Sequence, residues 1–138
     1  RTPRRNSSRL RKGRDRIMRT KLSEAKYLNL TQTINVYSSL CYNWDGYGGD
    51  KPDTKTIASV IQFCDVLKKY YISAPKCMVS GDGNISLFWD RDDVYIEISF
   101  DYEGKYSFLI KKLNDLYCGK DDCILSDTLD NDLLTFLA

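Results

Sequence analysis

The sequence contains no histidine, and this absence removes the usual general base, the usual zinc ligand and every nucleophile pair that depends on an imidazole. No apolar run approaches the roughly 18–20 residues needed to cross a membrane, so we expect a soluble protein. The five cysteines are an odd number without zinc-site spacing, which favours reduced thiols over disulfides or a metal centre. We therefore expect no cofactor, no metal and a cytoplasmic location.

Acidic residues are nearly missing from the first 21 positions. This segment has ten Lys or Arg residues against the single Asp15, whereas residues 22–138 have eleven basic and eighteen acidic side chains. Arginine outnumbers lysine eight to two there, and arginine is the better residue for bidentate contacts with phosphate or carboxylate. We predict a basic arm at 1–21, disordered or ordered by a partner, that contacts nucleic acid or an acidic protein surface, or has no specific target. The candidate binding residues are Arg4, Arg5, Arg9, Arg11, Lys12, Arg14, Arg16 and Arg19.

Carboxylates are the remaining candidates for catalysis, because two of them in different environments can divide the acid and base roles. The candidates are Asp45, Asp50, Asp82, Asp90, Asp92, Asp93 and Glu97. Aspartates beside glycines in tight turns usually hydrogen-bond their own backbone instead. We therefore expect a protein that is not an enzyme, and we keep a carboxylate-based hydrolase as a third class.

Two segments have the spacing of amphipathic helices. The first runs from about Ser23, a candidate N-cap, to Cys41. Its apolar positions at helical spacing are Tyr27, Leu30, Ile34, Tyr37 and Cys41. Leu10, Ile17, Met18 and Leu22 would form an apolar stripe if the arm became helical on a partner. The second helix is predicted to be capped by Asp53 or Thr54 and to continue to about Tyr71.

After Pro75 the apolar period changes from 3.6 to 2, which is typical of strands. Turn-forming clusters at 81–84, 90–93 and 103–104 separate the alternating segments, so we predict a three- to four-stranded antiparallel meander over about 76–110. The residues Ser126 to Leu137 predict a short C-terminal helix. The predicted fold is α+β, with two helices packed on the sheet in one domain at 22–138.

A glycine-rich loop joins the two helices, with the sequence Asn43-Trp44-Asp45-Gly46-Tyr47-Gly48-Gly49. It resembles the Asn-Trp-Asp-Gly-x-Gly-Ala type loop of a family of small uncharacterised bacterial and phage-borne proteins, with Gly49 in place of the usual alanine. The resemblance covers about Leu40 to Ile110 and implies this order of elements and a prokaryotic or phage setting, but no catalytic residue. Trp44 is expected to fill the space between helix and sheet, and Asp45 to close a turn. Alternatively, Trp44, Asp45 and Tyr47 form a recognition loop.

These observations favour a protein that acts by binding. The leading hypothesis is a non-catalytic interaction protein of a bacterial or phage system, of the antitoxin, immunity or anti-defence type. It is expected to bind a partner protein through its folded acidic body, residues 22–138, and to use the arm for a second contact. The alternative is a nucleic-acid-binding protein that uses the arginine-rich arm.

Overall fold

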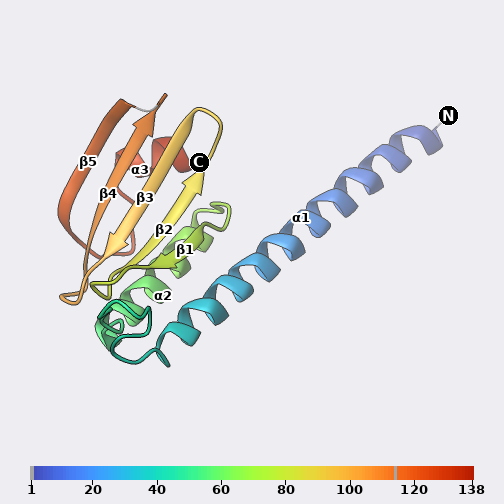
Figure 1. Ribbon diagram of the computed structural model, residues 1–138. Helices are drawn as coiled ribbons and strands as arrows, with labels where there is room; N and C mark the ends of the chain where they lie inside the picture. The colour runs from blue at the N-terminus through green and yellow to red at the C-terminus, as the bar shows by residue number, and fades with distance from the viewer. Residues whose placement is uncertain (1, 114) are drawn as a thin grey trace.

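The computed structural model describes residues 2–113 and 115–138, and within them the side chains of residues 11–113 and 115–138. The described chain forms three helices and five strands, which confirms the α+β prediction (Figure 1). The helices are α1 (Thr2–Tyr37), α2 (Thr54–Lys69) and α3 (Asn131–Leu137). The strands are β1 (Lys76–Val79), β2 (Ile85–Asp90), β3 (Val94–Phe100), β4 (Lys105–Lys112) and β5 (Asp115–Ile124).

The strands form one antiparallel sheet in the order β1-β2-β3-β4-β5. The alternation of Ile85, Leu87 and Trp89 in β2 and of Ile96 and Ile98 in β3 places these side chains on the buried face. The sheet has five strands instead of the predicted three to four, and β5 lies beyond the predicted meander. This edge strand includes Lys120, Asp121 and Asp122, and its pairing with β4 shifts register twice, so it shows no clean alternation.

A single core joins the three helices to the sheet. Ile34 of α1, Phe63 and Leu67 of α2 and Leu133 of α3 are buried together with Leu87, Ile98 and Ile110 of the sheet. Asp53 is the N-cap of α2, as predicted, and its carboxylate accepts a hydrogen bond from the amide of Lys55 at 2.8 Å.

Helix α1 differs from the prediction, since it begins at Thr2 instead of Ser23 and ends at Tyr37 instead of Cys41. The predicted start depended on apolar residues that could join the core, and the arm contributes almost none. Arginine and lysine are nevertheless good helix formers, so the helix continues through the arm. Figure 1 shows the N-terminal half of α1 extending beyond the body, whereas its C-terminal half packs beside α2 and β1. Tyr27 anchors the packed half, because its buried hydroxyl donates a hydrogen bond to the Ile72 carbonyl at 2.7 Å.

Candidate interaction surfaces

The basic side chains of α1 are directed to solvent. Arg11, Lys12, Arg14, Arg16 and Arg19 are all exposed. The salt bridges within the described part of the chain join other residues, so these five cations do not neutralise the acidic body of their own chain. The side chains of Arg4, Arg5 and Arg9 lie outside the described residues. The exposed cations of α1 are therefore available to an anionic partner.

A second set of exposed side chains on α1 is apolar. Met18, Leu22 and Val36 are 68%, 57% and 62% exposed, and they lie on the side of the helix opposite to the buried Tyr27, Leu30 and Ile34. The sequence prediction included Met18 and Leu22 in a stripe on the arm but did not extend the stripe into the packed half of the helix. The sequence does contain a signal for the longer stripe, because positions 18, 22, 25, 29, 32 and 36 are separated alternately by four and three residues, as in a coiled coil.

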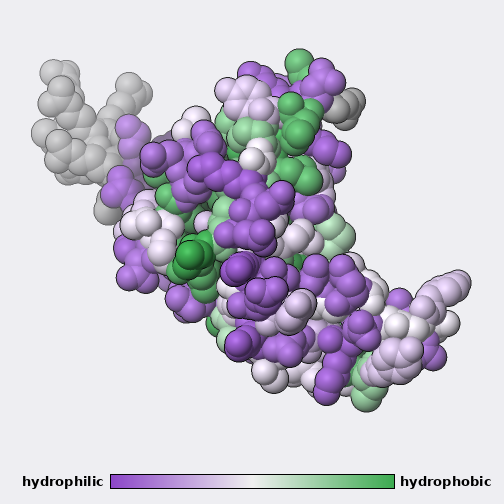
Figure 2. Space-filling model, turned by 90° about the vertical axis from the view of Figure 1, so that its left-hand side faces the viewer, coloured by the Kyte–Doolittle hydropathy of each residue, from purple (hydrophilic) through white to green (hydrophobic). Residues whose placement is uncertain are grey.

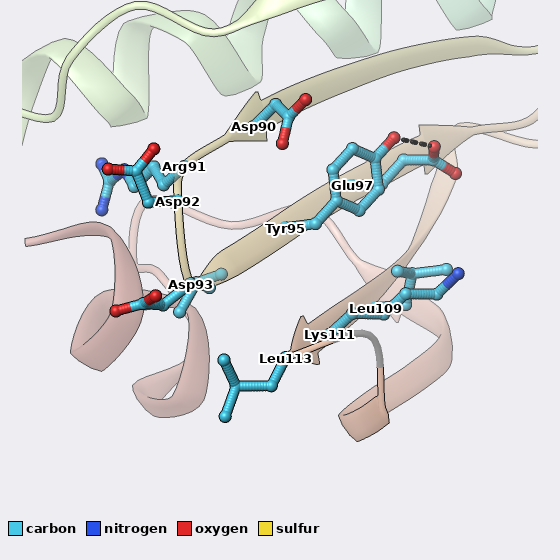
Figure 3. A pocket seen from close by; sticks show the side chains of 10 residues that line it. Asp90, Arg91, Asp92, Asp93, Tyr95, Glu97, Leu109, Lys111 and Leu113 are labelled. Atoms are coloured by element: carbon cyan, nitrogen blue, oxygen red, sulfur yellow. Dashed lines mark hydrogen bonds between the residues drawn. The ribbon is translucent and has the colours of Figure 1, made fainter.

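Most carboxylates of the body lie in its turns and loops and along β5. Figure 2 views the β5 side of the molecule and shows a mostly hydrophilic surface with small apolar patches. At the β2–β3 turn, Asp90, Asp92, Asp93 and Glu97 line an open hollow together with Lys111 (Figure 3). The acidic body is thus a second charged surface, separate from the basic helix.

Two charged side chains that line the hollow at the β2–β3 turn, Arg91 and Glu97, form hydrogen bonds with neighbouring parts of the fold. Arg91 donates hydrogen bonds to the carbonyls of Phe136 at 2.8 Å and Leu137 at 3.4 Å, so its guanidinium caps the end of α3. The Tyr95 hydroxyl donates to Glu97 Oε1 at 2.7 Å. The described residues contain no cluster of His, Cys, Asp or Glu that could hold a metal ion.

The loop between α1 and α2 is closed by its own polar side chains. Asp45 Oδ1 accepts hydrogen bonds from the amides of Tyr47 at 2.9 Å and Gly49 at 2.8 Å, and Asn43 Oδ1 accepts from the amide of Gly48 at 2.6 Å. The two amides that bind Asp45 favour its charged form and lower the pKa of this carboxyl. Asp45 thus closes a turn in the loop, as the sequence suggested.

Trp44 does not fill the space between helix and sheet. Its side chain is half-buried, and its indole N–H donates to the Asp50 carbonyl within the loop at 2.7 Å. The loop itself packs on the β1–β2 turn, where the amide of Asp50 donates to the Gly81 carbonyl at 2.8 Å. Trp44 and Asp45 therefore shape the loop, whereas Tyr47 lies at its tip and is 93% exposed. Tyr47 is the member of the predicted recognition loop that is freely presented to solvent.

The cysteine thiols are all free. Burial raises the pKa of Cys64 to about 12, and burial also raises the pKa of Cys77, Cys118 and Cys123. A raised pKa keeps these thiols protonated at neutral pH, which makes them poor nucleophiles.

No protein-family model matches this chain, and neither a curated protein nor a solved structure is significantly similar to it. None of the helices in residues 2–113 and 115–138 carries an apolar stretch that could cross a bilayer.

Proposed function

We propose that this chain is a non-catalytic interaction protein that binds a partner protein, with helix α1 as its main contact surface. The observation that carries the proposal is the exposure of the cations Arg11 to Arg19 on a helix that extends beyond the body (Figure 1), without salt bridges to the body in the described residues. A row of cations that is interrupted only by Asp15, and that has no salt bridge to the body among the described residues, is an electrostatic surface for an acidic partner.

The proposal also names a biological system and a cellular location for the protein. The likeness of the loop at 43–49 to the bacterial and phage-borne family supports a bacterial or phage interaction protein of the antitoxin, immunity or anti-defence type. The free cysteines support a cytoplasmic location. The hydrogen-bonded loop that presents Tyr47 supplies a second candidate contact, since exposed aromatic side chains are frequent interface anchors.

The alternative function is nucleic-acid binding. The eight arginines of residues 1–21 support it, because arginine contacts phosphates well. The excess of eighteen acidic over eleven basic side chains in residues 22–138 opposes it, because this body would repel a phosphate backbone.

The proposal is tested by photo-crosslinking in bacterial cells. A benzoylphenylalanine residue is placed at Leu22 on α1 in one variant and at the exposed Tyr102 of the β3–β4 turn in a control variant. We expect one recurrent protein adduct from position 22 that survives nuclease treatment and is weak or absent at position 102.

The alternative predicts a different result. Adducts would then be nucleic acid, and the affinity of the purified chain for duplex or single-stranded nucleic acid would fall steeply with salt. The slope of log K against log salt concentration would be about −0.7 to −0.9 for each phosphate neutralised. Submicromolar binding of this kind at physiological salt, without a protein adduct, would refute the proposal.

A further inference from the structure

The side of α1 that faces away from the body has the spacing of a coiled-coil face. The exposed stripe consists of Met18, Leu22, Ala25, Asn29, Gln32 and Val36, all of which are exposed. In heptad notation, Leu22, Asn29 and Val36 occupy a positions, and Met18, Ala25 and Gln32 occupy d positions. The buried Tyr27 and Ile34 occupy f positions and Leu30 a b position, so the body covers the opposite side of the same helix. The stripe is therefore free to receive another helix.

Basic side chains flank the exposed stripe on both sides. Arg14 and Lys21 are at g positions, Arg19 and Lys26 are at e positions, and all four are exposed. In a coiled coil the e and g residues of one helix meet those of the other and determine which partner is accepted. The partner is consequently selected by charge.

A second copy of this chain does not fit. In a parallel pair of α1 helices, Arg14 would face Arg19 and Lys21 would face Lys26. In an antiparallel pair, e residues would face e residues and g residues would face g residues, which again opposes cation to cation. Like charges at these positions are repulsive in either orientation. A helix with Glu or Asp at its e and g positions would instead form opposite-charge pairs with these four basic side chains.

The composition of the exposed stripe defines the partner helix further. The distance from Met18 to Val36 is about 27 Å at 1.5 Å per residue, so the stripe matches a partner helix of about three heptads. Asn29 is a polar residue at the central a position, and such a residue fixes the register of a coiled coil at a cost in stability. We therefore expect moderate affinity and a defined register.

We infer that the exposed stripe of α1 binds an acidic amphipathic helix of a partner protein and forms a heteromeric coiled coil with it. This inference rests on the proposed function as a protein-binding chain and names the chemistry of the partner. The apolar a and d residues supply the buried contact, and the basic e and g residues select an acidic helix over a second copy.

The test uses the full chain and two synthetic peptides of three heptads (about 21 residues), each with Ile at a, Leu at d and one central Asn at a. One peptide has Glu at every e and g position, and the other has Lys there. Fluorescence anisotropy with labelled peptide measures both affinities. We expect the Glu peptide to bind at least about tenfold more tightly than the Lys peptide. Equal affinities, or no binding of the Glu peptide, would overturn the inference.

Matched variants locate the contact. Leu22 and Ile17 are both 57% exposed on the same helix, but Leu22 is in the stripe and Ile17 is at a c position outside it. Leu22→Ser should weaken binding of the Glu peptide by about tenfold, since a buried leucine contact is lost, whereas Ile17→Ser should change it by less than about twofold. Far-ultraviolet circular dichroism of each variant establishes that α1 is retained.

A second pair of variants tests the charge selection. Arg19→Glu, at an e position, should reduce the affinity for the Glu peptide by more than Arg16→Glu, which makes the same charge change at a b position. If the two variants lose affinity equally and Leu22→Ser has no effect, the helix acts as a general polyanion-binding surface and the inference is wrong.

The crosslinking result and the peptide-binding result together show whether the acidic-helix inference fails by itself or with the proposed function. A protein adduct at position 22 without binding of the Glu peptide would refute the acidic-helix inference and leave the proposed function standing. Binding of the Glu peptide, with Leu22 required, would support the inference. The absence of any protein adduct in cells would count against the proposed function and also against the inference, which rests on it.

Discussion

Removal of residues 1–21 should leave the fold intact, although these residues continue directly into a helix of the body. The perturbation deletes the projecting half of α1 and leaves a chain of residues 22–138. It also tests the predicted boundary between arm and domain, which the continuity of α1 does not by itself decide.

The expected change in the free energy of unfolding is small for three structural reasons. The buried residues of α1 within its described side chains begin at Tyr27, and Ile17 and Met18 are 57% and 68% exposed, so little apolar burial is lost. Ser23 becomes available as an N-cap, which contributes about 1 kcal/mol. The helix macrodipole acts only within the first and last turns, so the cations of residues 11–21, which lie further along α1, contribute little to stability through it. We therefore expect the two chains to differ by no more than about 1 kcal/mol.

Urea unfolding monitored by circular dichroism measures this difference. Ile34→Ala in the full chain is the positive control, because Ile34 is fully buried and its truncation should cost about 2–5 kcal/mol. A loss of cooperative unfolding in the 22–138 chain, or a destabilisation as large as that of Ile34→Ala, would refute the reasoning and show that the arm contributes to the core.

Two further predictions concern the glycine residues and the loop. Gly46 has φ of 78°, so Gly46→Val should strain the backbone and destabilise the chain by about 1 kcal/mol or more. Gly13→Ala should instead stabilise α1 by up to about 1 kcal/mol, because the new methyl group meets no atom within 4 Å and alanine favours the helix. Urea unfolding measures both changes, and an unchanged free energy of unfolding for Gly46→Val would contradict the argument from backbone strain. The pKa of Asp45 is lowered from 3.8 in the folded state by the amides of Tyr47 and Gly49, so its charge stabilises the fold above about pH 4 and this contribution is lost as the pH falls through the lowered pKa. Asp45→Asn should therefore be less stable than the native chain at pH 7, with a smaller difference at pH 3, and an unchanged difference would show that the carboxylate charge has no role.

Several parts of the molecule followed from the amino-acid sequence alone. The spacing of Tyr27, Leu30 and Ile34 predicted the packed face of the first helix, because an apolar face must be buried wherever the helix docks. The alternation in residues 85–100 predicted antiparallel strands for the same reason. Asp45 was predicted to close a turn, because an aspartate beside glycine bonds its own backbone by local geometry. The charge separation between residues 1–21 and 22–138 is a property of composition and needs no structure.

Other features depended on tertiary contacts. Strand β5 forms because β4 presents an edge for it to pair with, and its own charged residues give no periodic signal. Trp44 is held by a carbonyl six residues away within a loop that docks on the β1–β2 turn, and no local pattern specifies that docking. The sequence by itself determined which residues of α1 are apolar, basic or polar. The exposure of Met18, Leu22 and Val36 depended on the tertiary structure, because α2 and β1 pack on the opposite side of α1 and no other described element covers this second apolar stripe.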